Sequence, residues 1–496
     1  MTAVLAGVSS PSFASSFEVE YQIEKDIEEN FTDSVTVTGT NEEHDVIKLD
    51  KKNSDYEVKI STSNEADGNI VLDGKGTADT PFLEADGIHI TDEPEGGKVE
   101  LDAAQNIEID VGNNGIDNSG AATVYIKAEG QIKIDAGIGQ TSAEGDGARL
   151  EGTGSIAILG NNTYISGHDE GLYVHKEAAS EEGIKVSARG ADKNGFGNII
   201  SGNDNGIESA GLAGIEVSAV YGNNRIYGGS CAVLNTGNGT IKITAGQRPD
   251  ESGISLLADY EGFDNIIGIK DDGTLSENGI KSSGAGLIDA YASHDNNIFG
   301  TENGISSTGA GMVKIVAGNN NIIGQYTDDE ENTVTSITGI NVSGGSVSLS
   351  AGSSNKIIGS SMGVSSNGTT TITAQYNNEI TGGDFSLGKG SGVNSVAGKT
   401  TILSQYGDNI IKGAFGGIIT NLGAYVSVTA YNQNYVDGNL ANGLYVSGQG
   451  ETYLKAAQNN IYGHNGINSE ANSYIELTAE NNGSLLEKTT IYKRRP

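Results

Sequence analysis

The sequence predicts an all-β protein that folds as a right-handed, three-sided parallel β-helix, with laps of about 23–26 residues and loop insertions. Three observations lead to this fold class. Glycines that end short apolar strands recur at the lap spacing, strand residues alternate between aliphatic and polar, and no segment has a helical period. One lap cannot bury its apolar side alone, so laps must stack around a continuous interior. The right hand follows from the crossover rule for parallel strands.

The first strand of each lap shows the alternation most clearly. The residue after its aliphatic position varies and includes charge, as in Lys412 and Asp437, so this column is expected to face solvent. Ile267, Phe299 and Ile323 belong to the same outward column. The inward column, two residues before each strand-ending glycine, is always β-branched: Ile165, Ile200, Ile226, Ile266, Ile298, Ile322, Ile357, Ile380, Ile411, Val436 and Ile461.

The second and third strands repeat this pattern. In the third strand, Val313, Ile315 and Ala317 are predicted to point inward and Lys314 outward. A glycine precedes ten of eleven inward residues of the second strand, which indicates either unusual dihedral angles or a close approach between laps. Those residues are Leu172, Ile207, Val233, Ile280, Ile305, Ile340, Val364, Val393, Ile418, Leu444 and Ile467.

Asparagine recurs at the turn that closes the lap. Stacked in register, such amides can hydrogen-bond along the solenoid axis, and asparagine tolerates turn conformations. We therefore expect an asparagine ladder from Asn223-Asn224, Asn296-Asn297, Asn319 to Asn321, Asn377-Asn378 and Asn459-Asn460.

The chain divides into four predicted segments. Residues 1–16 resemble the end of a truncated signal peptide, with small residues before a cleavage point after Ala14, although a flexible apolar N-terminus explains them too. Residues 17–67 are acidic, lack the repeat and are predicted to cap the β-helix. The repeat domain covers residues 68–483. Residues 484–496 form a C-terminal tail, which is expected to be truncated before a translocator.

Composition excludes several functions. The net charge of −36 disfavours nucleic acids and anionic lipid, and the only basic cluster is Lys493 to Arg495. No apolar run is long enough for a transmembrane helix. The single cysteine, Cys231, sits at an inward strand position, so we expect a packing role. No cofactor is expected.

Candidate chemistry is sparse. His168 to Glu170 with His175 form the densest group of histidine and carboxylate residues, and Asp271-Asp272 is an isolated pair. A polysaccharide hydrolase needs several aspartates on adjacent laps and a basic clamp, and we expect these partners to be absent here. Solvated turns are therefore expected at both places. Residues 328–331, an acidic run, lack a calcium-loop spacing and are expected to form a charged loop.

Tyrosines form the one candidate contact surface. They recur just before the lap-closing turn and would form a stripe along one edge, to which sugars or a protein partner could bind. Stacking within the turns is the alternative explanation. The predicted stripe consists of Tyr221, Tyr291, Tyr376, Tyr406 and Tyr431.

The laps resemble a known family. Laps such as NNNIIG and ENGISSTGAG, with strong acidity and one cysteine, resemble the passenger domains of bacterial autotransporters and related surface adhesins over residues 68–483. The resemblance implies export through a C-terminal β-barrel and localisation at the cell surface, on the outer membrane of a Gram-negative-type bacterium, or secretion. That translocator barrel is expected to be missing from this chain.

These observations predict a non-enzymatic structural rod that mediates adhesion or self-association. Its expected partners are a host or bacterial surface glycan or protein, or another copy of itself. A β-helix polysaccharide hydrolase or lyase is the alternative, and it requires carboxylates from several laps to converge in a cleft. A phage or cell-wall fibre is a third reading, and it would need trimer-forming ends.

Overall fold

The computed structural model describes residues 15–19, 27–39, 45–49, 57–74, 83–91, 96–139, 145–180, 182–247, 262–327, 333–470, 472–481 and 484–489. The chain forms two compact units, Met1–Ser230 with Gly239–Lys242 and Cys231–Asn238 with Ile243–Pro496. Every regular element in the described residues is a β-strand. The predicted three-sided parallel β-helix is confirmed. No helix among these residues is long and apolar enough to cross a membrane.

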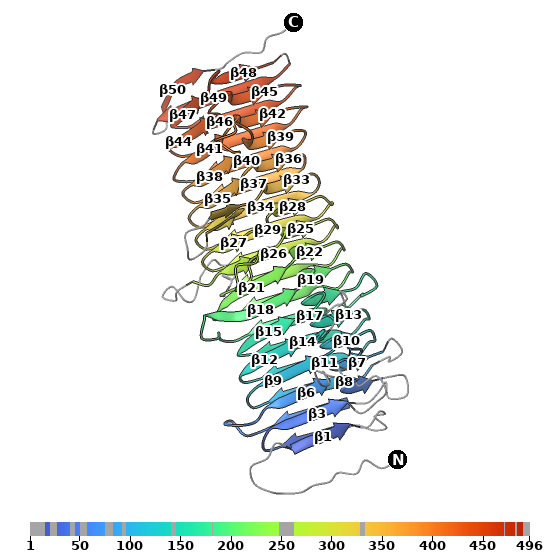
Figure 1. The fold of residues 1–496 in the computed structure, drawn as a ribbon. Helices are drawn as coiled ribbons and strands as arrows, with labels where there is room; N and C mark the ends of the chain where they lie inside the picture. Colours follow the sequence, from blue (N-terminus) through green and yellow to red (C-terminus); the bar gives the residue numbers. More distant parts are fainter. Residues whose placement is uncertain are drawn as a thin grey trace. The chain divides into compact units, whose positions relative to one another are not determined.

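The first unit stacks its strands in three parallel sheets (Figure 1). Sheet A contains β1 (Ser15–Val19), β3 (Val35–Gly39), β6 (Ile70–Gly74), β9 (Ile107–Val111), β12 (Gln131–Asp135), β15 (Asn162–Ser166), β18 (Phe196–Gly202) and β21 (Asn223–Gly228). Sheet B contains β2 (Ile27–Phe31), β5 (Glu57–Thr62), β8 (Lys98–Ala103), β11 (Thr123–Ala128), β14 (Ser155–Gly160), β17 (Ile184–Ala188) and β20 (Ile215–Ala219). Sheet C contains β4 (Ile47–Leu49), β7 (Ile88–Ile90), β10 (Ile116–Asn118), β13 (Ala148–Leu150), β16 (Leu172–Val174) and β19 (Asn205–Ser209).

The second unit is likewise built from three parallel sheets, and β23 (Ile241–Ala245) contains residues of both units. Sheet A contains β24 (Asn265–Ile267), β27 (Asn296–Ile298), β30 (Asn321–Ile323), β35 (Asn355–Gly359), β38 (Asn378–Gly382), β41 (Asn409–Gly413), β44 (Gln433–Asp437) and β47 (Gln458–Tyr462). Sheet B contains β26 (Leu287–Ala292), β29 (Met312–Ala317), β34 (Ser346–Ala351), β37 (Thr369–Ala374), β40 (Lys399–Ser404), β43 (Tyr425–Thr429), β46 (Glu451–Ala456) and β49 (Tyr474–Asn481). Sheet C contains β22 (Cys231–Asn235), β25 (Asn278–Ser282), β28 (Asn303–Ser307), β33 (Thr338–Val342), β36 (Met362–Ser366), β39 (Ser391–Ser395), β42 (Gly416–Thr420), β45 (Asn442–Val446) and β48 (Ile467–Ser469).

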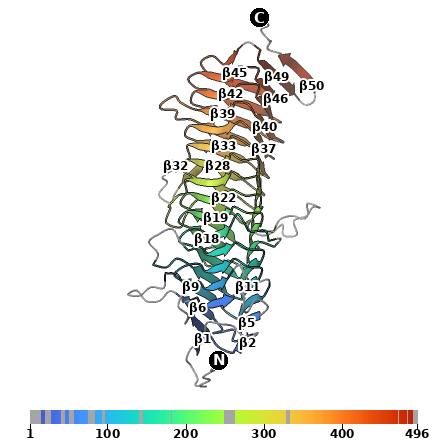
Figure 2. The ribbon, with the colours of Figure 1, turned by 90° about the vertical axis from the view of Figure 1, so that its right-hand side faces the viewer.

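Among the described strands, two pairs run antiparallel and interrupt this pattern. β31 (Gln325–Thr327) and β32 (Thr333–Thr335) form a hairpin in an insertion that the spacing predicted. β50 (Ser484–Thr489) runs antiparallel to β49, beside which Figure 2 shows it. β50 thereby pairs with the otherwise open edge of sheet B in the last lap.

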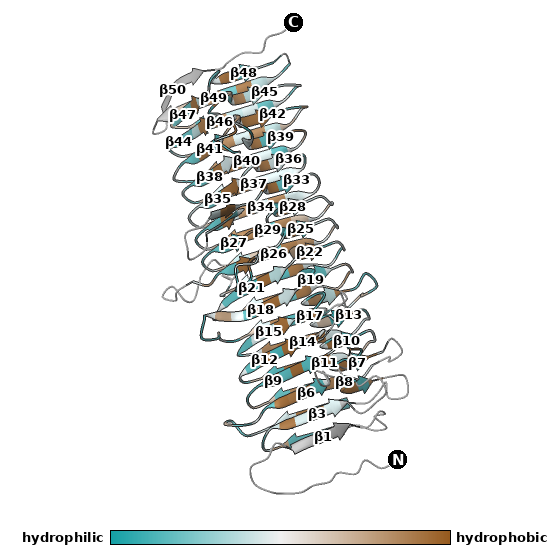
Figure 3. Ribbon diagram, viewed as in Figure 1, coloured by the Kyte–Doolittle hydropathy of each residue, from teal (hydrophilic) through white to brown (hydrophobic). Residues whose placement is uncertain are grey.

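The core is formed by aliphatic columns in strict register. In sheet B, Ile315 of β29 pairs with Ala290 on one side and Leu349 on the other, and all three are buried. Lys314, next in sequence to Ile315, lies on the outer face, as predicted. Figure 3 shows this alternation as brown and teal bands along the strands. Burying each of these aliphatic side chains stabilises the folded state by roughly 1.5–3 kcal/mol.

The predicted inward position is wrong by one residue in two laps of sheet A. Ile267 and Ile323 are buried and pair with Ile298, whereas Ile266 and Ile322 face outward. In these laps the glycine directly follows the buried residue: Gly268 and Gly324 have φ of 92° and 80°. Their free choice of dihedral angles lets the strand end one residue earlier.

Phe299 corrects a further prediction. It was expected to face solvent, but its relative exposure is only 1%. Its ring lies 6.3 Å from the ring of Tyr326 in β31, so a side chain of the hairpin insertion packs against it. The column pattern cannot detect such cover, because an insertion supplies it.

The predicted asparagine ladder is confirmed and is longer than expected. Nδ2 of each residue donates to Oδ1 of the next at 2.8–2.9 Å. In the first six members, the second N–H donates to a backbone carbonyl at 2.8–2.9 Å. A shorter ladder in the first unit runs from Thr163 through Asn198 to Asn224. The ladder of the second unit comprises Asn265, Asn296, Asn321, Asn355, Asn378, Asn409, Asn434 and Asn459, of which all but Asn459 are fully buried.

Close approach between laps explains the glycine before the second strand. A Cβ atom on Gly304 would lie 2.6 Å from Cγ2 of Ile323 and 2.8 Å from the carbonyl oxygen of Gly339. The φ angle of Gly304 is not in the left-handed region. Of the two reasons that the sequence left open, space is therefore the one that requires glycine at this position.

The predicted cap takes part in the ladder. β3 pairs in parallel with β6, β4 with β7 and β5 with β8, so laps already exist within residues 27–62. Val35, Val37 and Ile60 are buried in the same columns as later laps. The segment lacks the Asn and Gly turn signature, which is why the sequence did not reveal these laps. The predicted cleavage point after Ala14 and the basic cluster at 493–495 lie outside the described residues.

Candidate functional site

Three of the five predicted stripe tyrosines gather in the second unit. Tyr376, Tyr406 and Tyr431 follow β37, β40 and β43 in consecutive laps and are 50%, 57% and 62% exposed. Adjacent rings lie 6.5 Å apart, centroid to centroid. We call these three residues the tyrosine edge.

The other two stripe tyrosines differ. Tyr291 lies within β26 rather than after it, and it is only 7% exposed, so its assignment to an outward stripe is wrong. Its hydroxyl donates to the carbonyl of Gln247 at 3.4 Å. Tyr291 precedes the inward Ala292, whereas Tyr376 comes two residues after the inward Ala374. Tyr221 is exposed but belongs to the first unit.

Backbone hydrogen bonds between laps hold the tyrosine edge in place. The amide of Tyr376 donates to the carbonyl of Ser353 at 2.9 Å, and the amide of Tyr406 donates to that of Gln375 at 2.8 Å. The amide of Asn432, directly after Tyr431, donates to Gly407 at 3.1 Å. The rings are therefore presented on a fixed backbone at lap spacing, about 4.8 Å per strand.

A second set of tyrosines lies on the sheet faces of the last laps. Tyr425 and Tyr453 have ring centroids 5.1 Å apart, as do Tyr435 and Tyr462. The hydroxyl of Tyr453 donates to Glu451 at 3.0 Å. Burial, and then this hydrogen bond, raise the pKa of Tyr453 to about 12. Tyr453 and Tyr435, which donates to Asp437 at 3.3 Å, are thus tied to neighbouring carboxylates, unlike the tyrosine edge.

Acidic side chains also stack along the turn between sheets A and C of the first unit. Asp86, Asn114, Asp146 and Glu170 each directly precede a glycine, and all are buried. A side-chain oxygen of each of the first three accepts the backbone amide of the next member: Asn114 donates to Asp86 at 2.8 Å, Asp146 to Asn114 at 2.8 Å and Glu170 to Asp146 at 3.1 Å. Carboxylates here replace the amides of a simple asparagine ladder.

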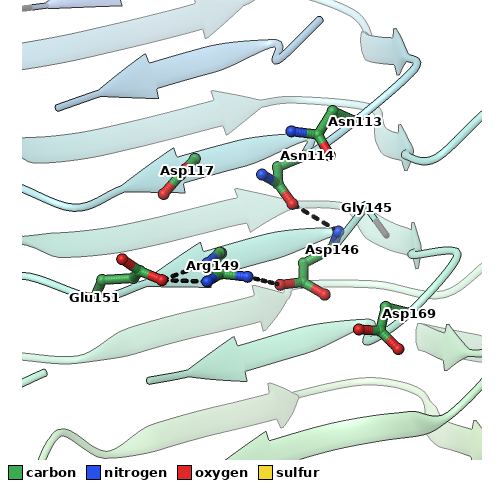
Figure 4. Close-up of a pocket in the computed structure, with 8 residues that line it drawn as sticks. All are labelled: Asn113, Asn114, Asp117, Gly145, Asp146, Arg149, Glu151 and Asp169. Carbon is green, nitrogen blue, oxygen red and sulfur yellow. Dashed lines mark hydrogen bonds and ion pairs between the residues drawn. The ribbon is translucent and has the colours of Figure 1, made fainter. Parts of the chain in front are cut away.

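A cavity of about 330 Å³ opens beside this stack (Figure 4). Figure 4 shows Arg149 between two carboxylates: Nη1 lies 3.3 Å from Asp146, and Nε donates to Glu151 at 2.8 Å. Asp117 and Asp169 lie on either side of this group. Asn113, Asn114 and Gly145 complete the lining.

This cavity overturns one expectation. Asp117, Asp146 and Asp169 come from three consecutive laps, and Arg149 supplies a basic group between them. Both features were expected to be absent. Aligning the laps on Gly115, Gly147 and Gly171 would have revealed the stack, since Asn114, Asp146 and Glu170 each directly precede one of these glycines. Glu170, expected in a solvated turn, is only 7% exposed.

The cavity holds carboxyl groups with opposite shifts in pKa. Burial raises the pKa of both Asp117 and Asp169. The negative charge of Asp204 raises the pKa of Asp169 further. Burial also opposes ionisation of Glu151, but the hydrogen bond and charge of Arg149 lower its pKa below the usual value. Burial and the charge of Asp146 raise the pKa of Glu170. Protonated and ionised carboxyl groups thus coexist in this part of the unit.

The stack makes the first unit sensitive to pH. Burial raises the pKa of Asp86 to about 7. Burial alone would lower the pKa of His89, but the hydrogen bond that its ring donates to Asp45 and the neighbouring charges raise it to about 8. Because the pKa values of Asp86 and His89 are both raised, both groups stabilise the fold at low pH. The contribution of Asp86 is lost as the pH rises through about 7, and that of His89 as it rises through about 8. Asp45, whose pKa is lowered through His89, loses its contribution only at acid pH below this window.

We therefore expect the first unit to be more stable at pH 5 than at pH 8.5, by about 3 kcal/mol from Asp86 alone. Asp86→Asn keeps the acceptor for the amide of Asn114 and should flatten this dependence. Hydrogen exchange of β7 and β10 at the two pH values, corrected for intrinsic rates, measures the effect. Equal protection of the wild type at both values would contradict the pKa assignment.

In the part of the chain that the structure describes, three clusters place potential metal-ligand atoms within 4.8 Å of one another. They are Asp45, Asp86 and His89; Asp146, Asp169 and Glu170; and Asp264, His294 and Asp295. In the first, Nδ1 of His89 lies 2.9 Å from Asp45, and in the third, Nδ1 of His294 lies 2.8 Å from Asp264. The ion pairs within two of the clusters account for this proximity.

The remaining candidate residues from the sequence lie in an exposed turn or pack against their neighbours. Asp271 and Asp272 lie in an exposed turn, as predicted. Cys231 is 3% exposed at an inward position of β22, also as predicted. His175 is half-buried and packs edge-on against Tyr173, with ring centroids 6.0 Å apart. The acidic run 328–331 lies outside the described residues.

Comparison with protein-family models, with curated proteins and with solved structures found no match to this chain.

Proposed function

We propose that this chain is a surface-displayed or secreted structural protein that mediates adhesion or self-association, similar in role to an autotransporter passenger. The observation that carries the proposal is the tyrosine edge, three exposed aromatic rings fixed on consecutive laps. Tyrosine is enriched at binding interfaces because its ring buries apolar area while its hydroxyl forms hydrogen bonds. Buried columns occupy the interior, so such contacts must come from outward side chains.

Removing the tyrosine edge should abolish most adhesion. We expect beads coated with the triple variant Tyr376→Ala, Tyr406→Ala, Tyr431→Ala to adhere to epithelial cells, or to one another, about tenfold less than wild-type beads. Tyr221→Ala, an exposed tyrosine of the first unit, is the matched control and should adhere normally. Circular dichroism checks the fold. Undiminished adhesion of the triple variant would contradict the proposal.

The acidic cavity supports a second candidate, a polysaccharide hydrolase or lyase. Carboxylates from several laps converge there, and the pKa of Glu151 is lowered while those of Asp117 and Asp169 are raised. Glycoside hydrolysis pairs an ionised carboxylate with a protonated one, so this divergence suits that chemistry. In this reading Asp169 or Asp117 donates a proton to the leaving oxygen, and Glu151 acts as base or nucleophile.

This second candidate makes a sharp prediction. If the cavity is catalytic, the full chain will release reducing ends from polygalacturonate, xylan or a mixed-linkage glucan. Asp169→Asn and Glu151→Gln will then each lower the rate about 100-fold or more. The triple tyrosine variant serves as the control and should retain the rate. Absence of reducing ends and of unsaturated products with every substrate would rule this candidate out.

A further inference from the structure

The tyrosine edge is almost free of charge. The three segments that carry it, 369–377, 399–408 and 425–433, contain only two charged residues, Lys399 and Asp408. The carboxylate of Asp408 already accepts from Gln433, from its amide at 3.1 Å and from Nε2 at 3.3 Å. Charged residues make up 19% of the chain, whose net charge is −36. A neutral surface of this size is therefore a local exception.

The polar groups of this surface are available to a ligand. Among the described residues, the hydroxyls of the tyrosine edge and the exposed side-chain amides of Gln375 and Gln405 have no hydrogen-bond partner. Several other tyrosines of the last laps differ, since Tyr445 donates to Glu470 at 2.5 Å and Tyr474 to Glu476 at 2.7 Å. The tyrosine edge thus combines exposed rings on three consecutive laps with free hydroxyl and amide groups.

The neighbouring face of sheet B extends this neutral surface. Thr371 of β37 pairs with Thr401 of β40, which pairs with Ser427 of β43, and all three side chains face outward. Thr373 and Thr429 occupy the next outward position of β37 and β43. Hydroxyl groups therefore follow the same consecutive laps as the tyrosine rings.

We propose that the tyrosine edge binds an uncharged glycan strand, an inference that rests on the proposed adhesive function. Sugar rings present apolar C–H faces that pack on aromatic rings, and their hydroxyls both donate and accept hydrogen bonds, as amides and hydroxyls do. A chain of such units running along the laps meets one tyrosine per lap. Anionic glycans are disfavoured because the acidic protein repels them.

The test uses the full chain and calorimetric titration with hexamers of glucose, mannose and N-acetylglucosamine, and with the polygalacturonate hexamer as the anionic probe. At least one neutral hexamer should bind. The triple variant should weaken its affinity about tenfold or more, and Tyr221→Ala should leave it unchanged. Raising NaCl from about 0.05 M to about 0.5 M should change Kd less than about twofold, because no charge pairing contributes.

The possible results separate this inference from the proposed function. Failure of every neutral hexamer to bind, with bead adhesion that still depends on the tyrosine edge, overturns the glycan inference and leaves adhesion standing. Binding that the triple variant retains, or salt-sensitive binding of polygalacturonate alone, overturns it too. Hexamer binding that requires the tyrosine edge, without adhesion of coated beads, supports the glycan site and overturns the adhesive role.

Discussion

Asn378→Leu should lower the free energy of unfolding of the second unit by roughly 3–5 kcal/mol. Asn378 accepts from Asn355 and donates to Asn409, both at 2.8 Å, and it donates to the carbonyl of Leu403 at 2.9 Å. Leucine leaves an amide N–H of Asn355 without an acceptor, and it removes a donor from Asn409 and Leu403. Each buried unsatisfied group costs about 1–3 kcal/mol.

Urea denaturation gives the overall loss, and hydrogen exchange should localise it to β35, β38 and β41. Asn432→Ala is the matched control, because Asn432 is exposed and its side chain makes a single long hydrogen bond of 3.5 Å. It should change stability by less than about 0.5 kcal/mol. If Asn378→Leu were as mild as the control, the ladder would not stabilise the interior.

Gly363→Ala should lower the free energy of unfolding by about 2–3 kcal/mol, although alanine is usually more favourable than glycine within a strand. A Cβ atom at this position would lie 2.7 Å from both the carbonyl oxygen of Gly392 and Cγ2 of Ile380. Neither neighbour can move freely, since Ile380 is fully buried and Gly392 belongs to β39 of the next lap. The laps must therefore separate locally.

The control for this substitution is Ser365→Ala, on the outer face of the same strand, β36. It should leave the urea midpoint unchanged within error. The protection of β36 and β39 against hydrogen exchange should fall only for Gly363→Ala. A neutral or stabilising effect of Gly363→Ala would show that the glycine serves another purpose than close packing.

Most of the fold was predictable because stacking imposes one rule on every lap. Residues such as Ile305 and Ile315 must be apolar wherever the lap lies, so a single sequence reveals the columns. The predicted inward and outward positions were wrong where a local feature altered the lap. Gly268 and Gly324 shifted the strand end by one residue. The hairpin insertion covered Phe299, and no periodicity records that contact.

The candidate sites were harder to predict because surface positions obey no repeating rule. Tyrosines near the lap-closing turn suggested the tyrosine edge, but the offset of Tyr291 from the inward alanine decided its burial. The acidic cavity was missed because Asp117, Asp146 and Asp169 come from three different laps and therefore lie far apart in sequence. They converge only when laps are aligned on the correct glycine, and insertions of varying length obscure that alignment.

The central claim is that the tyrosine edge, and not the acidic cavity, carries the function. The most direct test is one bead-adhesion assay that compares the wild type, the triple tyrosine variant and the cavity double variant Glu151→Gln, Asp169→Asn. We predict that adhesion falls about tenfold for the triple variant and remains at the wild-type level for the cavity variant. Loss of adhesion in the cavity variant, with the triple variant unaffected, would contradict the claim.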